Sequence, residues 1–175
     1  MKWMSGLLLV VAASGQQIDL SVLDRLASKA KSSVNLALDE DKLRFASAFL
    51  SEDDKNQADA KNLVGRLKTI NVRVLEFDEP GVVSPSDLDA IRAQLRGPGW
   101  SKIVEARDRR ESAEIYMFSK AKDFGGMMIL VSEPKELVVV NIVGPVDMQT
   151  LLNLGGKFGI PKNIIESTKK KGKDD

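Results

Sequence analysis

Residues 100–145 read WSKIVEARDRRESAEIYMFSKAKDFGGMMILVSEPKELVVVNIVGP, and this stretch decides the fold. It contains four strand-length runs rich in apolar and β-branched residues, at 101–108, 112–120, 127–132 and 136–143. The connections between these runs are short and rich in turn residues. Because a parallel return needs a dozen or more residues, neighbouring runs must pair antiparallel. The stretch therefore predicts a four-strand meander.

Two further strands are expected upstream of the meander. Residues 69–77 (TINVRVLEF) alternate, with Ile70, Val72 and Val74 on one side and Asn71 and Arg73 on the other. This alternation is typical of a half-buried strand. Residues 33–38 (SVNLAL) alternate in the same way and predict a short strand. The sheet should then have about six strands, most of them antiparallel.

The remaining segments show helical spacing. Apolar residues recur at intervals of three or four in residues 18–31, 39–50, 58–68 and 84–95. In the second of these segments Phe45 and Phe49 are expected to face inward, and Asp147 can cap a last helix that ends near Leu154. The fold class predicted is α+β, with the helices packed largely on one face of the sheet.

The N-terminus has the order of a secretory signal. Lys2 provides a positive start, residues 6–13 are an apolar run, and Ala13 and Gly15 are small residues before a cut ahead of Gln16. The apolar run is much shorter than the roughly 20 residues of a membrane-spanning helix. The alternative is a buried first strand or helix. We expect residues 1–15 to be the signal peptide, 16–156 a single domain, and 157–175 a basic, flexible tail ending in lysines.

Composition excludes several classes of function. The chain has 26 Lys and Arg against 25 Asp and Glu, so it lacks the basic excess of a nucleic-acid-binding protein. It has no His and no Cys, which removes the commonest general base, disulfides, thiolate chemistry and Cys-ligated zinc. The missing Cys also excludes a bacterial lipid anchor. We expect no cofactor, no metal and no transmembrane span.

Carboxylates are the remaining candidates for acid–base chemistry. The densest groups, at residues 39–41 and 52–54, lack the glycine and ligand spacing of a calcium loop, so helix starts and solvated loops explain them better. Ser119 and Lys120 are neighbours on an expected strand, so their side chains point to opposite faces and cannot form a catalytic dyad. No catalytic, cofactor-binding or metal-binding residue is predicted, and the binding residues stay unassigned.

Two further features have alternative readings. Trp100, Tyr116 and Phe118 could form a stacking platform for bases or sugars, although core packing is the simpler role. Asn141 lies within an apolar strand, where its amide needs partners. It either bonds to nearby backbone or has a role in binding.

The segment 100–152 resembles a bacterial family of unknown function, the domain of unknown function 4252 family. The resemblance depends on Trp100, on the run Glu114-Ile115-Tyr116, and on the motifs at residues 125–130, 133–137 and 140–147. It extends by the order of the upstream helices to about residues 18–154. The resemblance implies an exported α+β domain and provides no catalytic residue.

These observations predict an exported protein, periplasmic or secreted and not lipid-anchored, that acts as a non-enzymatic binding or interaction module of the cell envelope. Its partner would be another protein or a small ligand. The alternatives are a carboxylate-dependent hydrolase, which needs two acidic groups in one pocket and a raised pKa, and an accessory to envelope signalling. Self-association through an uncovered sheet face is also expected if all helices lie on the other face, with Val139 as an outward position.

Overall fold

The computed structural model describes residues 17–50, 55–120 and 123–145. Six strands form one sheet in the order β1-β2-β6-β5-β4-β3, and every neighbouring pair is antiparallel. The strands are β1 Ser32–Leu38, β2 Thr69–Glu76, β3 Trp100–Asp108, β4 Glu111–Lys120, β5 Asp123–Ser132 and β6 Glu136–Val143. The α+β class, the six strands and the C-terminal meander β3–β6 are thereby confirmed.

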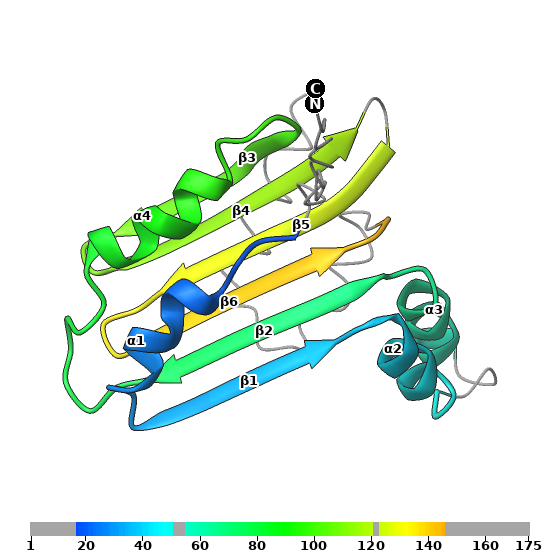
Figure 1. The fold of residues 1–175 in the computed structure, drawn as a ribbon, viewed down its shortest axis with the longest axis horizontal. Helices are drawn as coiled ribbons and strands as arrows, with labels where there is room; N and C mark the ends of the chain where they lie inside the picture. The colour runs from blue at the N-terminus through cyan, green and yellow to red at the C-terminus, as the bar shows by residue number, and fades with distance from the viewer. Residues whose placement is uncertain (1–16, 51–54, 121–122, 146–175) are drawn as a thin grey trace, which may run out of the picture.

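The helices lie in two places relative to the sheet (Figure 1). On one face lie the 3₁₀ turn η1 (Ser21–Leu23), the short helix α1 (Asp24–Ala27) and the helix α4 (Pro85–Gln94). The helices α2 (Glu40–Ser47) and α3 (Lys55–Val64) lie beside the end of β1 and β2. The Asp39 carboxylate accepts a hydrogen bond from the Lys42 N–H and caps α2, as the sequence predicted.

Two apolar clusters hold the layers together, one on each face of the sheet. Alternate strand positions, such as Leu75, Leu137 and Val139, pack with Leu23 and Leu26 beneath η1 and α1. The intervening positions form the second cluster, which also contains Leu43 of α2, Leu63 of α3 and Leu67, three residues after α3. Because both faces bury apolar side chains, the central strands β5 and β6 are apolar at nearly every position.

The prediction of a single helix at residues 18–31 is wrong. Residues 18–20 are not helical, and only η1 and the four-residue α1 follow. The Ile18 N–H donates to the Asn141 side chain, and both the N–H and the carbonyl of Asp19 bond to the Gln94 side chain, so long-range contacts take up the carbonyl that a helix starting here would use. The apolar side chains still reach the core, since Leu20, Leu23 and Leu26 are buried.

Phe45 and Phe49 do not face inward as predicted. The two residues are 69% and 74% exposed, and their rings contact each other edge to face with centroids 5.0 Å apart. Helix α2 lies at the end of the sheet and buries only Leu43, so its remaining apolar face has no sheet to cover. Phe45 lies two residues from Leu43, about half a turn round the helix, so the two side chains cannot share one inward face.

Val139 is not an outward position. Its side chain is fully buried in the cluster beneath η1 and α1, so a lysine there would break the core and could not test association. Self-association was expected only if one face of the sheet carried no helix. That condition is not met, because α2 and α3 contribute to the second cluster. The expected signal peptide, the helix from Asp147 to Leu154 and the basic tail lie outside the described residues.

Candidate functional site

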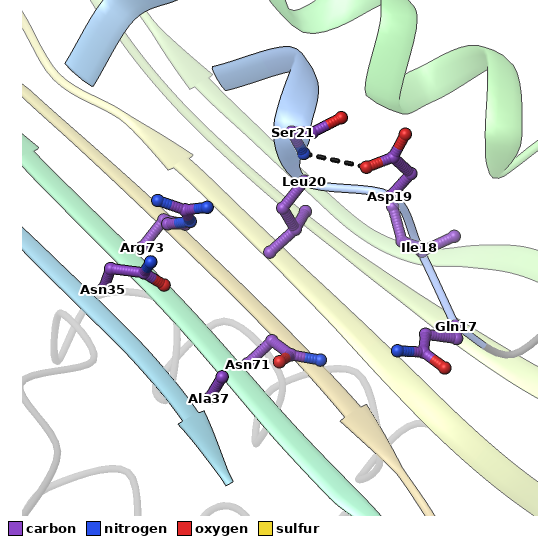
Figure 2. A pocket seen from close by; sticks show the side chains of 9 residues that line it. All are labelled: Gln17, Ile18, Asp19, Leu20, Ser21, Asn35, Ala37, Asn71 and Arg73. Atoms are coloured by element: carbon purple, nitrogen blue, oxygen red, sulfur yellow. Dashed lines mark hydrogen bonds between the residues drawn. The ribbon is translucent and has the colours of Figure 1, made fainter. Parts of the chain in front are cut away.

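A groove of about 530 Å³ lies between the N-terminal segment and the strands β1 and β2 (Figure 2). We call it the N-terminal groove. Its lining residues are Gln17, Ile18, Asp19, Leu20, Ser21, Asn35, Ala37, Asn71 and Arg73. Six of these nine side chains are polar or charged, which is unusual for a hollow beside an apolar core and favours a polar ligand.

The floor of the groove is set by strand register. Asn35 pairs with Arg73, and Ala37 pairs with Asn71, so all four side chains point to the face that carries η1. The Arg73 side chain is 19% exposed and its guanidinium lies 3.2 Å from the carboxylate of Asp24, which is 62% exposed. Because the carboxylate of Asp24 is so exposed, its ion pair with Arg73 is weak. An incoming anion can therefore replace Asp24 and bind the guanidinium.

The opposite wall is the extended segment 17–20, and the side chains of Asn141 and Gln94 fix its position. The N–H of Ile18 donates to Oδ1 of Asn141 at 3.3 Å, while Nδ2 of Asn141 donates to the Met127 carbonyl at 3.3 Å. Asn141, within β6, therefore hydrogen-bonds to main-chain groups, which is one of the two roles that the sequence predicted for it. Although it stands at the register position beside Asn71, it is fully buried and acts on the groove by holding its wall.

Asp19 carries the second charge in the lining. Its carboxylate accepts a hydrogen bond from the Ser21 N–H at 2.9 Å. Hydrogen bonding by the Ser21 side chain, and after it by this N–H, holds the pKa of Asp19 below its usual value. In Figure 2 the carboxylate points away from the floor, toward Ser21 and α4. The floor itself therefore presents one charge, the guanidinium of Arg73, with Asn35 opposite it on β1 and Asn71 two residues away on β2.

A separate ionic cluster lies beneath α4 and is centred on Glu114 of β4. Glu114 is fully buried and accepts hydrogen bonds from Arg92 at 2.6 Å and from the Tyr116 hydroxyl at 2.5 Å, while Lys102 lies 3.2 Å away. Burial alone would raise the pKa of Glu114, but hydrogen bonds from Arg92, Tyr116 and Lys102 outweigh it and hold the pKa at about 2. A carboxylate this acidic stays ionised at neutral pH and cannot act as a general acid, so we assign the cluster a structural role.

A second hollow of about 360 Å³ lies at the opposite end of β2 and β6 and is acidic. It is lined by Lys31, Glu76, Phe77, Glu133, Pro134, Lys135 and Glu136. Glu76 and Glu136 are register partners on neighbouring strands. Burial, together with the charges of Glu133 and Glu76, raises the pKa of Glu136. This is the arrangement that the hydrolase alternative required, a raised carboxyl pKa beside further carboxylates.

The aromatic candidates pack in the core instead of forming a platform. Trp100 and Phe118 meet edge to face with centroids 5.3 Å apart, and Phe118 and Tyr116 are buried. The acidic run at 52–54 lies outside the described residues. Within the described part of the chain, no three acidic side chains converge as metal ligands, and no helix is long and apolar enough to cross a membrane.

Sequence reasoning missed both the groove and the buried cluster. The groove had a visible signal, since Asn35, Asn71 and Arg73 are the polar members of two alternating strands. Glu114 also stood two residues before Tyr116, which places both on one face of a strand. What the sequence did not show is that Arg92, from a helix 22 residues upstream, would reach Glu114.

A family model, described as a domain of unknown function (DUF4252), matches residues 28–154. The match covers more than half of the chain and includes all six strands. No curated protein matches the sequence. The resemblance inferred from the meander motifs is thus confirmed over a longer range than the segment in which it was clearest.

Proposed function

Since the chain belongs to the DUF4252 family, whose description assigns no activity, we propose a function from the N-terminal groove: a non-enzymatic binding module of the cell envelope. Its ligand would be a small polar molecule that carries a carboxylate. The observation that carries this proposal is the position of Arg73, the one charged group on the groove floor, opposite Asn35 and two residues from Asn71 on the same strand.

Size and chemistry both support this ligand class. A volume of about 530 Å³ is within the range of small-molecule sites in proteins. A guanidinium can donate two parallel hydrogen bonds to one carboxylate, and this geometry favours a carboxylate over a neutral group. The side-chain amides of Asn35 and Asn71 offer donors and acceptors for hydroxyl or amide groups of the same ligand. The placement in the envelope is supported by the signal-like order of residues 1–15.

Thermal melting and calorimetry of the purified full chain test the proposal. The probes are small hydroxy, amino and sugar acids, each compared with its own primary amide. We expect one or more acids to raise the melting temperature while the matched amide does not. Arg73→Gln should abolish the shift. Arg107→Gln, at a 65% exposed arginine on β3, is the matched control and should keep it. If no acid shifts the melting temperature, or if the shift survives Arg73→Gln, the proposal is wrong.

One observation favours a second candidate, a carboxylate-dependent hydrolase at the acidic hollow. Glu136 has a raised pKa and lies across the strand pair from Glu76, so it could hold the proton that a general acid needs. Chromogenic esters and glycosides provide the assay. Turnover that is lost in Glu136→Gln and kept in Arg73→Gln would support the hydrolase. Absence of turnover would leave the acidic hollow without a catalytic role.

A further inference from the structure

Among the residues that the structure describes, strand β1 (Ser32–Leu38) forms one border of the sheet and has a single strand neighbour, β2 (Figure 1). Six of its seven residues are exposed. Val34 and Leu36, which point to the same face, are 51% and 42% exposed. An uncovered, apolar edge strand of this length is a ready template for pairing with another strand.

The two edges of the sheet differ in protection. The other edge strand, β3, carries Lys102, Glu105 and Arg107 and has an irregular register between Lys102 and Val104. Charges and bulges are the usual means by which edges avoid pairing with other strands. β1 has no charged residue, no proline and an unbroken register with β2. The fold thus blocks pairing at β3 and leaves β1 able to pair.

The unpaired main-chain groups of β1 can be identified from the ladder. The Phe77 N–H donates to the Lys135 carbonyl, in register with the pairing of β2 and β6, so odd-numbered residues of β2 direct their polar groups to β6. Even-numbered residues of β2 therefore face β1, where Val72 pairs with Leu36 and Val74 with Val34. It follows that Ser33, Asn35 and Ala37 direct their N–H and C=O groups to the free edge.

These groups are complementary to a second copy of the same strand. Antiparallel pairing about Asn35 places Asn35 opposite its equivalent and Ser33 opposite Ala37 of the second copy, so all the outward groups find partners. It also places exposed Val34 beside exposed Leu36 of the second copy. At the two ends, Lys31 falls opposite Asp39 of the second copy. Each is in an exposed ion pair within its own chain, with Asp78 and Lys42, and such pairs are weak, so unlike charges can meet at both ends of the seam.

We propose that two copies of this chain associate through β1, in antiparallel register about Asn35, to form one continuous sheet. The symmetry axis is perpendicular to the sheet, so both copies present the same face on the same side. Because Asn35 and Ala37 also line the N-terminal groove, the two grooves lie on either side of the seam. The association is independent of what the groove binds.

Concentration-dependent sedimentation and amide hydrogen exchange of the unaltered full chain test this proposal. We expect a dimer at millimolar concentration, and slower exchange at Ser33, Asn35 and Ala37 than in the dilute protein. A monomer at millimolar concentration, or a dimer in which these three amides exchange as fast as in the dilute protein, would overturn the proposal.

Two variants with a matched control sharpen the result. Asn35→Pro removes an outward N–H without removing a bond to β2, and should weaken association at least about tenfold with little change in melting temperature. Val34→Lys combined with Leu36→Lys places like charges across the seam and should do the same. Ile103→Lys, at a residue of β3 that is 36% exposed, should leave the dimer intact. A dimer that survives both changes in β1 would contradict the assignment.

Discussion

The side chain of Gln94 and the main chain of Asp19 exchange two hydrogen bonds across 75 residues of sequence: the Asp19 N–H donates to Oε1 at 2.8 Å, and Nε2 donates to the Asp19 carbonyl at 3.0 Å. Gln94 is the last residue of α4. The wall of the N-terminal groove is therefore attached to the helix that also covers the buried cluster. This pair of bonds links the shape of the groove to the packing of the sheet.

Replacing Gln94 should loosen the groove wall without unfolding the domain. Gln94→Ala removes both bonds to Asp19, at a cost of about 1–2 kcal/mol in the free energy of unfolding. Amide exchange at Ile18 and Asp19 should become faster, and binding of a carboxylate ligand should weaken. Gln57→Ala, in α3, is the control that changes the same residue type away from the groove. Unchanged exchange at Asp19 would contradict the role of Gln94.

Replacing Glu114 should cost far more than replacing its exposed neighbour. Glu114→Gln leaves the Arg92 guanidinium, whose side chain is only 18% exposed, without its buried countercharge. Loss of one partner from a buried pair costs about 3 kcal/mol or more. Asp89→Asn removes the other carboxylate on Arg92, which is 62% exposed, and should cost less than about 1 kcal/mol. Urea unfolding of the two variants measures the difference, and equal costs would contradict the structural role of Glu114.

The same carboxylate should make the fold sensitive to acid. Because the pKa of Glu114 is lowered from 4.5 to about 2, its contribution to stability is present in full above pH 4.5. It is lost as the pH falls from 4.5 toward 2, where the folded protein must take up the proton. The stability difference between the natural chain and Glu114→Gln should therefore shrink over this range. Unfolding curves at a series of pH values provide the measurement, and a constant difference would refute the assignment.

The sequence predicted the sheet better than the site, and the reason is physical. Alternation in residues 69–77 and short turns in residues 100–145 are local patterns, so they specify strands and antiparallel neighbours without tertiary information. The groove depends on pairings such as Asn35 with Arg73, and the buried cluster on Arg92 reaching Glu114. Those contacts join segments far apart in sequence. Hydrogen bonds to Asn141 and Gln94, which are also distant in sequence, likewise overrode the helical spacing of residues 18–31.

At the acidic hollow, the carboxyl group of Glu136 should change the stability of the fold with pH in the direction opposite to that of Glu114. Burial and the charges of Glu133 and Glu76 raise the pKa of Glu136, so its ionised form destabilises the fold as the pH rises above 4.5. Glu136→Gln should therefore stabilise the protein at neutral pH, by less than about 1 kcal/mol, because it removes repulsion across the strand pair. Lower stability of the variant in thermal unfolding would show that the carboxylate has a favourable partner.

The N-terminal prediction can now be tied to the groove. Cleavage ahead of Gln16 would keep residues 17–20, in which Ile18 and Leu20 are 4% and 8% exposed, while cleavage after Leu20 would remove the groove wall. A chain that begins at Ser21 should lose about 3 kcal/mol or more of stability, because burying each of these side chains contributes about 1.5–3 kcal/mol. A chain that begins at Gln16 should keep full stability and bind the groove ligand.

Mass spectrometry of the protein from its native host should find an N-terminus near Gln16. An intact N-terminus in the cytoplasm would contradict export, and equal melting temperatures of the two shortened chains would contradict the structural role of the wall.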